Sequence, residues 1–474
     1  MTIEALEEEV KRLRQELAEA HILIAKLQAE LEHLRADPPP CIKPNTTKAK
    51  DKGEKKERRK RAKDQNGARR REIPTQIVQH TIEQCPDCHY PLSRRLLANR
   101  RQVIELPPPQ PVEITEHQVF KSWCARCQRW HYAPLDLSGQ VVGQGRMGVR
   151  ITSLIAYLRT TLRLGVEQIR EYLHSMHKLC ISTGEIVELL HRLVESEPVK
   201  GAVEAVHEQV RKSRIVHGDE TGWRQGGQNG YIWLFCTPEG ERYYEYDHSR
   251  SGAVAKRILG SDFNGTLVTD FYAAYNDFPG EHQRCWVHLL RDLHELKEEH
   301  KGNEQVIGWA AGVRKLYDTA HQRLHCEDPP SQAEREILYI ELMESVRELG
   351  GRYCAARPHK EHPCHALCKR LLRHQDELFR FVLQPDLCAD NNLAERSVRP
   401  VVVMRKVSGG SKSARGSRTR MRLASLFGTW RAKGLNPFTE CLLLLSQPNP
   451  NPIPTQTSAL CTLNLNSYKS GIRS

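Results

Sequence analysis

Long apolar runs are missing from this chain of 474 residues. No segment approaches the ~20 apolar residues that a membrane-spanning helix needs. The first 37 residues are charged and periodic, unlike the apolar core of a signal peptide. We therefore expect a cytoplasmic protein that does not contact membranes. A strand–GxxxxGK[ST]–helix is missing as well, so the sequence does not predict ATP use.

Acidic residues are absent between Arg396 and Lys433, where 11 Lys and Arg occur. Residues 41–72 hold 14 Lys and Arg against 5 Asp and Glu, a net charge of +9. The whole chain carries +13, so the remainder sums to about −7 (13 − 11 − 9). The basicity is therefore local, and two segments are predicted to contact DNA phosphates. The candidate DNA-binding residues of the second segment are Arg396, Arg399, Arg405, Lys406, Lys412 and Arg415.

Two Cys-x-x-Cys pairs stand out among the 15 cysteines, Cys85 with Cys88 and Cys124 with Cys127. In an intracellular protein such pairs favour metal binding over disulfides. Each pair can supply two thiolates to one tetrahedral Zn²⁺, and two strand-like runs lie between them. We predict a zinc ribbon with one structural Zn²⁺ and these four ligands. A redox role is the alternative, which the second copy disfavours. His89 or His131 could replace a thiolate, although a lone histidine beside such a cysteine pair is more often a surface residue.

The chain begins with an apolar repeat that steps by alternating threes and fours over nearly five heptads. This is the seam of a coiled coil, and it predicts a homodimer. The alternative, an amphipathic helix packed on its own protein, would show a wider apolar face. The positions are Ile3, Leu6, Val10, Leu13, Leu17, Ala20, Ile24, Leu27, Leu31 and Leu34.

Residues 148–211 have helical periodicity in three stretches, ITSLIAYLRTTL, VEQIREYLHSM and TGEIVELLHRLV. Ser182 or Thr183 is expected to cap the last stretch. Two short helices about a turn are typical of a helix-turn-helix, but the second is acidic and apolar. A plain helical bundle is the alternative.

Strand-like runs follow at 214–218, 230–236 and 242–247, separated by Gly- and Pro-marked turns, and they predict a three-strand meander. Asp219 directly follows the first run. A further strand over 266–269 is followed by Asp270, and a downstream helix carries Glu395. Three carboxylates placed in this way could gather around hard divalent cations such as Mg²⁺. The chemistry that this indicates is phosphoryl transfer on nucleic acid.

Each carboxylate has a structural alternative. Asp270 could cap the turn after its strand, and Glu395 could pair with Arg399 one helical turn on. Because neighbouring residues of a strand point to opposite faces, Glu220 is expected to face away from Asp219 or to bind locally. Asp390 is a rival third carboxylate, but it stands where a helix N-cap belongs. Pro400 is expected to stop or kink the helix of Glu395.

Four phrases around these carboxylates carry a family resemblance. They are HGDETGWR at 217–224, TDFYAAY at 269–275, CWVH at 285–288 and NNLAERSVRP at 391–400. Their order and spacing resemble those of the bacterial DDE transposases of the insertion sequence 66 family, over roughly residues 1–445. Within the CWVH phrase, packing is favoured for Cys285. His288 stays open between packing and positioning a phosphate or a metal-bound water.

The resemblance implies a multidomain protein whose α/β core is RNase H-like and has a helical insertion. The expected domains are a coiled coil at 1–37, a basic disordered linker at 38–72, the zinc ribbon at 73–135, a helical domain at 136–212, the DDE catalytic core at 213–445 with its insertion at about 296–384, and a disordered tail at 446–474.

The resemblance also implies the chemistry. Asp219, Asp270 and Glu395 would hold two Mg²⁺ or Mn²⁺ ions and catalyse DNA strand cleavage and strand transfer at the ends of an insertion sequence. The expected partners are the terminal repeats and target DNA. Family members are often encoded with small accessory proteins, which are candidate partners. The tail departs from the family pattern, so the alternative is a catalytically silent DNA-binding regulator or a degenerate transposase copy.

Overall fold

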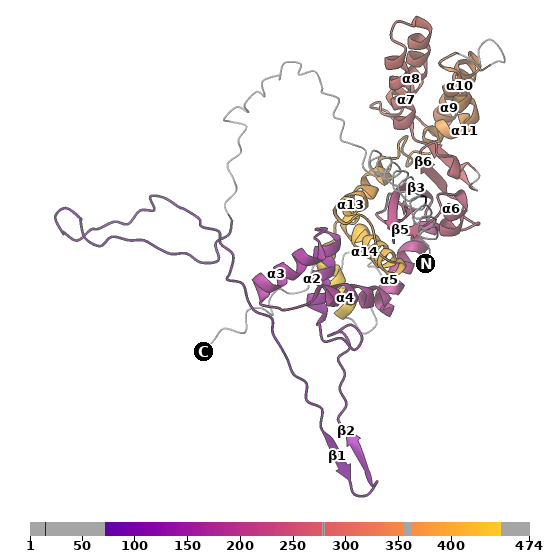
Figure 1. Cartoon of the computed structure of the whole chain (residues 1–474). Helices are drawn as coiled ribbons and strands as arrows, with labels where there is room; N and C mark the ends of the chain where they lie inside the picture. The colour runs from indigo at the N-terminus through magenta and orange to yellow at the C-terminus, as the bar shows by residue number, and fades with distance from the viewer. Residues whose placement is uncertain (1–14, 16–71, 277, 279, 355–361, 447–474) are drawn as a thin grey trace, which may run out of the picture. The chain divides into compact units, whose positions relative to one another are not determined.

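The computed structural model describes residue 15 and residues 72–276, 278, 280–354 and 362–446 (Figure 1). They fall into two compact units, Met1–Leu106 and Pro107–Ser474. Apart from residues 15, 72 and 446, the predicted coiled coil, basic linker and tail lie outside the described residues. None of the described helices combines the length and the apolar character needed to cross a bilayer.

The second unit is a mixed α/β fold built on a five-stranded sheet in the order β5-β4-β3-β6-β7. The first three strands in sequence pair antiparallel, whereas β6 joins β3 and β7 joins β6 in parallel. The meander predicted for the first three strands is confirmed. The strands are β3 Ile215–Gln225, β4 Gln228–Cys236, β5 Arg242–Asp247, β6 Thr266–Thr269 and β7 Glu281–Arg284.

Strand β3 runs seven residues past the predicted end at Gly218, to Gln225. Its turn into β4 is the pair Gly226 and Gly227, which have φ of +59° and +84°. Two positive φ values in succession are what a two-residue hairpin turn requires, and glycine adopts them without steric cost. The hairpin therefore closes at the glycine pair and not at the earlier Gly218.

The two faces of the sheet are covered by different helices. α13 Asn392–Ser408 and α14 Ala414–Ala432 pack on the face that carries Trp223, Ile232 and Leu234, here called the α13 face. α6 Gly252–Leu259 packs on the opposite face, with Val216 and Trp233. Because side chains alternate along β3, His217 and Asp219 share the α13 face with Trp223, whereas Glu220 belongs to the α6 face.

Helix α13 continues through Pro400 to Ser408, so the expected stop is wrong. A proline inside a helix costs about 3 kcal/mol. Ala394 and Val398 before it and Val401 and Met404 after it are all buried against the sheet. Each buried side chain of this size contributes about 1.5–3 kcal/mol, so burial on both sides of Pro400 outweighs that cost.

The segment before the sheet folds as four helices that share one core with α14 and the last helix. Ser182 caps the third, as expected, by accepting a hydrogen bond from Glu185 N at 3.0 Å. That helix, the expected second member of a helix-turn-helix, contacts the other three and α14, as in a bundle. The helices are α2 Val149–Thr160, α3 Val166–His177, α4 Thr183–Glu195, α5 Glu197–Lys212 and α15 Pro437–Ser446.

Between β7 and α13 the described residues form six helices, which share a separate core around Trp286, Trp309 and Leu342. They begin at Trp286, immediately after the strand, ten residues before the predicted start of the insertion. In Figure 1 they gather at one end of the unit, beyond β6. They are α7 Trp286–Glu299, α8 Glu304–Leu324, α9 Gln332–Gly351, α10 His365–Arg373, α11 Gln375–Leu378 and α12 Arg380–Leu383.

The loop between α13 and α14 adds a short pairing to the end of β3. Ser411 N donates to Arg224 O and Gly226 N donates to Ser411 O, both at 2.8 Å. Gly410, with φ of +124°, makes this approach feasible, because a Cβ there would lie 2.1 Å from Arg224 O. The loop is therefore fixed to the sheet by a position that only glycine can occupy.

Replacement of Gly410 by Ala is expected to destabilise the protein by about 3 kcal/mol, since it adds a backbone clash to an unfavourable φ. Gly409→Ala is the matched control. Gly409 also has a positive φ, +69°, but a Cβ added there would meet no atom within 4 Å, so its loss should be about 1 kcal/mol. Thermal unfolding and hydrogen exchange at the Ser411 amide measure the difference. Equal losses in the two variants would contradict this account of the loop.

Candidate active site

The pairing of β3 with β6 brings Asp219 and Asp270 together. His217 pairs with Val268 in the parallel ladder. When this register is continued by two residues, Asp219 lies beside Asp270, which directly follows β6. Both side chains are then on the α13 face. Neighbouring strands lie about 4.8 Å apart, so the two carboxylates become neighbours.

Glu395 joins them from above the sheet. It lies in the first turn of α13, which packs against β3 and β4. The pKa of Asp219 is raised to about 7, first by burial and then by the nearby charges of Glu220, Asp270 and Glu395. A hydrogen bond of 2.8 Å from Glu220 N to Asp219 Oδ1 acts in the opposite direction. The three predicted carboxylates thus lie within electrostatic reach of one another.

Glu220 belongs to a separate group on the α6 face, and the expectation that it faces away and binds locally is confirmed. Its Oε1 accepts a hydrogen bond of 2.7 Å from Arg250 Nη2, and its Oε2 accepts one of 2.6 Å from the Tyr275 hydroxyl. Its side chain is only 3% exposed. Glu220 therefore has a positive partner, which leaves Asp219 as the carboxylate of β3 that can take a ligand.

The structural alternatives for Asp270, Asp390 and Glu395 have different outcomes. Asp270 Oδ1 does accept a hydrogen bond from Tyr272 N, at 2.9 Å. The expectation that Asp390 is the N-cap of α13 is wrong, since Asn391 has that position; Asp390 lies one residue earlier, and its Oδ1 accepts a hydrogen bond of 2.9 Å from Asn392 N. Among the described residues no ion pair joins Glu395 to Arg399; Glu395 Oε1 instead lies 3.7 Å from His288 Nε2.

Cys285, His288 and Glu395 also lie close together, with one ligand atom of each within 4.8 Å of the others. Burial raises the pKa of the Cys285 thiol, so it stays protonated and is a poor metal ligand. Glu395 Oε1 and His288 Nδ1 are buried atoms without a hydrogen-bond partner among the described residues. Orphaned buried polar atoms are costly, and a ligand bound between the carboxylates would satisfy Glu395.

The donor set fits Mg²⁺ or Mn²⁺. Such hard cations take oxygen ligands, and Asp219, Asp270 and Glu395 supply carboxylates from three different elements. A divalent cation would also cancel the mutual repulsion that raises the pKa of Asp219.

A buried network that the sequence did not predict fixes β3 against α13. Asn391 Oδ1 lies 3.1 Å from His217 Nδ1, and Asn391 Nδ2 donates to Gly218 O at 2.8 Å. Asn391 N in turn donates to Cys285 Sγ at 3.1 Å. Burial lowers the pKa of His217 to about 4, which keeps it neutral. Because Asn391 is the N-cap of α13, these contacts fix the position of Glu395 relative to Asp219.

A second unpredicted network holds Asp270. Arg284 on β7 is fully buried, and its Nη1 donates to Asp270 O at 2.9 Å and Thr269 Oγ1 at 3.2 Å. The same guanidinium pairs with Glu377 on α11, whose Oε2 also lies 3.1 Å from His374 Nδ1. The insertion thus supports the end of β6 through a buried ion pair.

The predicted DNA-binding residues fall into two groups. Arg405 donates to Thr221 Oγ1 at 3.1 Å, and Arg415 pairs with Glu188 and Glu195 on α4. These two arginines connect parts of the protein to each other. The rest have exposed side chains on α13 and the following loop. They are Arg396, Arg399, Lys406 and Lys412.

The cysteine pairs lie in different units. Cys85 and Cys88 belong to the first unit. In the second, Cys124 and Cys127 have ligand atoms within 4.8 Å of each other and of His131. The hairpin of β1 Lys121–Cys124 and β2 Arg129–Tyr132 produces this grouping. The two strand-like runs predicted between the pairs are wrong, because residues 101–106 and 112–120 form no strand.

A sequence model described as the IS66 family of transposases matches residues 144–419. The matched range includes all three carboxylates, the insertion and α13.

Three curated proteins of Sinorhizobium fredii (strain NBRC 101917 / NGR234) are similar to the chain. Uncharacterized protein y4qI is 25% identical over 260 residues, 48% of this chain and 47% of the relative. Uncharacterized protein y4jO is 28% identical over 160 residues, 33% of this chain and 46% of the relative. Uncharacterized protein y4jD is 24% identical over 213 residues, 41% and 40% respectively. The chain thus spans less than half the length of each relative.

Among solved structures, one chain in the cryo-EM structure of a simian T-cell lymphotropic virus intasome in complex with PP2A regulatory subunit B56 gamma is 14% identical. The match covers 32% of this chain and 61% of that chain, with a TM-score of 0.14. A score this low carries no argument about the fold.

Proposed function

This chain belongs to the IS66 family of transposases, and from that premise we propose that it cuts DNA strands at the ends of an insertion sequence and joins them to target DNA. The observation that carries the proposal is the parallel pairing of His217 with Val268, two residues before Asp219 and Asp270, together with Glu395 in the first turn of α13, which packs on β3 and β4. The fold proposed for the core is RNase H-like. The order β5-β4-β3-β6-β7, with three antiparallel strands followed by two parallel ones, supports it.

We propose that Asp219, Asp270 and Glu395 hold a pair of Mg²⁺ or Mn²⁺ ions. When bound, these ions would lower the pKa of the attacking hydroxyl or water and stabilise the departing oxygen. The chain's own part is positioning. Arg284 fixes the backbone of Asp270, Asn391 fixes the start of α13, and the Glu220–Arg250 pair keeps a fourth carboxylate out of the site.

The proposed reaction has two steps. Water first attacks a phosphodiester at the element end. A P–O bond forms, the bond from phosphorus to the 3′ oxygen breaks, and that oxygen takes up a proton. The freed 3′-hydroxyl then attacks a phosphodiester of target DNA, forms a new P–O bond and releases a target 3′-hydroxyl. No covalent bond to the protein is needed. We propose that His288, whose Nε2 lies 3.7 Å from Glu395 Oε1, contacts a phosphate oxygen.

DNA is the proposed partner, through the exposed residues Arg396, Arg399, Lys406 and Lys412 and through the basic segment at 38–72. Arg405 and Arg415 are proposed to contribute positive charge indirectly, because their hydrogen bonds are directed to protein atoms. Homodimerisation through residues 1–37 and the use of small accessory proteins remain predictions from the sequence.

The test of this function is incubation of the purified chain with a duplex carrying the element end and Mg²⁺ or Mn²⁺. The expected product is a nicked strand with a 3′-hydroxyl, which EDTA prevents and fresh Mg²⁺ restores. Specific binding without any metal-dependent product would favour the second candidate, a DNA-binding regulator or degenerate copy.

We also propose one structural Zn²⁺ held by Cys85, Cys88, Cys124 and Cys127. His131 is the rival ligand, because it lies beside Cys124 and Cys127. Backbone N–H groups lower the pKa of Cys85 and Cys124, which favours the thiolate form that binds zinc.

Removal of one zinc ligand is expected to lower zinc affinity at least about tenfold, since a closed tetrahedral site needs all four. Cys85→Ser and Cys124→Ser should both lose zinc, and His131→Ala should retain it. Zinc per chain after dialysis, and the absorption bands of the Co²⁺-substituted protein, measure this. Cys180→Ser removes another exposed cysteine and is the control. Loss of zinc in His131→Ala but not in Cys85→Ser would replace the four-cysteine site by one that includes His131.

A further inference from the structure

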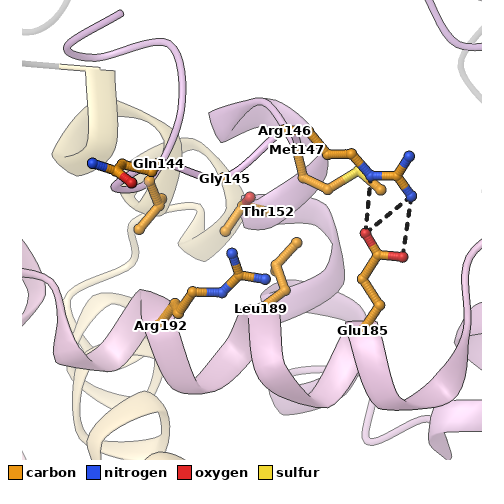
Figure 2. Close-up of a pocket in the computed structure, with 9 residues that line it drawn as sticks. Gln144, Gly145, Arg146, Met147, Thr152, Glu185, Leu189 and Arg192 are labelled. Carbon is orange, nitrogen blue, oxygen red and sulfur yellow. Dashed lines mark hydrogen bonds and ion pairs between the residues drawn. The ribbon is translucent and has the colours of Figure 1, made fainter.

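Two cavities lie beside the helical bundle, and they differ in charge. The first, of about 320 Å³, lies between α4 and the 142–147 segment (Figure 2). Its Arg146 is paired with Glu185 through two hydrogen bonds of 3.2 Å. The second, of about 350 Å³, lies between α2, α4 and the loop that joins α13 to α14. It differs from the first in having no acidic residue in its lining.

The second cavity, here called the arginine pocket, is basic. Its cationic residues are Arg159 from α2, Lys412 from the loop and Arg420 from α14, whereas burial lowers the pKa of His191 from α4 and keeps that side chain neutral. No Asp or Glu lines it, whereas the first cavity contains Glu185. Positive charge in a recess without a carboxylate indicates an anionic ligand from outside.

The two arginines are held in place by neutral groups. Arg159 Nη1 donates to Leu164 O at 2.5 Å, and Arg420 Nη1 donates to Ser408 Oγ at 2.8 Å. The Arg420 guanidinium also lies 5.7 Å from the centre of the Trp223 ring. Burial, and then the charge of Arg159, lowers the pKa of Arg420 to about 9. The charge of Arg159 acts on Arg420, so the two guanidinium groups repel each other, and a bound anion would relieve that repulsion.

The first turn of α14 adds to this charge. Ser413 caps the helix by accepting from Gly416 N at 3.1 Å, and both residues line the pocket. The helix spans 19 residues and has no acidic residue in its first turn. Its N-terminus therefore contributes partial positive charge on the same side as the two arginines.

The pocket also has an apolar side, formed by Val166, Val187, Leu190, Met404 and Leu423. Inorganic phosphate would leave these side chains uncovered. A phosphate that carries sugar carbons would use both the charged and the apolar sides. The lining thus favours a phosphate of a nucleic-acid backbone over a free phosphate ion.

The position of the pocket relates it to the carboxylates. Ser411 lines the pocket and pairs with Gln225 at the end of β3, six residues after Asp219. At about 3.3 Å per strand residue, the loop lies at most roughly 20 Å from Asp219. A DNA strand rises about 3.4 Å per nucleotide, so this distance corresponds to about six nucleotides.

We propose that the arginine pocket binds one backbone phosphate of the DNA strand that is cut, within about six nucleotides of the scissile phosphate. The identity of the bound strand rests on the proposed function. The contact itself rests on the residues that line the pocket. The pocket is a positioning site: it sets the register of the strand over the carboxylates and takes no part in the chemistry.

The test is fluorescence anisotropy with a 30-base-pair duplex carrying the element end, in EDTA, between 50 and 200 mM salt. Arg420→Gln should weaken binding about tenfold and lower the slope of log Kd against log salt by about one. Lys412→Gln should weaken binding about threefold. Because the Lys412 side chain is exposed, this variant keeps the test decisive if Arg420→Gln misfolds. Lys315→Gln makes the same charge change on an exposed position of α8 and should leave Kd within twofold.

Methylphosphonate substitution then locates the contact. A single neutral linkage within six nucleotides of the cut should weaken binding by the wild type. On that modified duplex, the wild type and Arg420→Gln should have the same Kd. If no such position exists, or if Kd and the salt slope are unchanged in both pocket variants, the proposal fails. If millimolar inorganic phosphate competed with DNA but neither variant changed the Kd for DNA, the pocket would be assigned to a free anion instead. Because no cleavage is measured, an inactive enzyme would overturn the proposed function and leave this result standing.

Discussion

Asp219→Asn is expected to reduce Mg²⁺-dependent strand cleavage at least about a thousandfold while DNA binding in EDTA stays within about twofold. The substitution keeps the size of the side chain and removes the charge of a carboxylate that lies close enough to those of Asp270 and Glu395 to feel their charges. Metal coordination contributes several kcal/mol to the transition state, and about 4 kcal/mol corresponds to three orders of magnitude in rate. A gel assay of single-turnover nicking on the element end measures the loss.

Asp262→Asn is the matched control for this prediction, because Asp262 is exposed in the loop before β6 and has no part in the site. It should cleave at the wild-type rate. If Asp219→Asn cleaved as fast as Asp262→Asn, the carboxylate on β3 would not be catalytic. If both variants and the wild type bound DNA but none cut it, the chain would be a DNA-binding regulator.

Glu377→Gln is expected to lower the free energy of unfolding by about 3–5 kcal/mol at pH 7. It leaves the fully buried guanidinium of Arg284 without its negative partner, and an unpaired buried charge carries a penalty of this size. Since Arg284 also binds the carbonyl of Asp270, cleavage should fall as well. Glu348→Gln removes an exposed pairing with Arg352 in the same insertion and should cost less than about 1 kcal/mol.

The same variant has a pH signature. Burial alone would raise the pKa of Glu377, but the hydrogen bond with His374 and the charge of Arg284 outweigh it and hold the pKa at about 2. The ordinary value is about 4.3, so this stabilisation is complete above that pH and is lost as pH falls toward 2. The difference between wild type and Glu377→Gln should therefore shrink between about pH 4.5 and pH 2. Chemical unfolding at pH 7 and pH 3 measures it, and a constant difference would contradict the ion pair.

The meander and the carboxylate positions were predictable because their signals are local. Runs such as 230–236 and 242–247 are rich in aromatic residues, as strands are, and Asp270 directly follows the four-residue strand β6. The opposite orientations of Asp219 and Glu220 follow from strand alternation alone. The helical bundle was predictable for the same reason, down to the Ser182 cap.

The supporting contacts were not predictable, because they join residues far apart in sequence. Arg284 and Glu377 are 93 positions apart, and Asn391 and Gly218 are 173 apart. The only signal for Asn391 was its place at the start of the 391–400 phrase, which contains Glu395. The course of α13 through Pro400 likewise depends on burial against the sheet, which local propensity does not include. The arginine pocket was missed because its walls come from three distant segments, of which only the loop and α14 were recognised as basic.

The most direct test of the central claim is anomalous X-ray diffraction from crystals of the full chain soaked in Mn²⁺. The account predicts manganese bound by the carboxylates of Asp219, Asp270 and Glu395, and its disappearance in crystals of Asp219→Asn. Manganese at other residues only, or none at this site in crystals whose protein still cuts DNA with Mn²⁺, would contradict it.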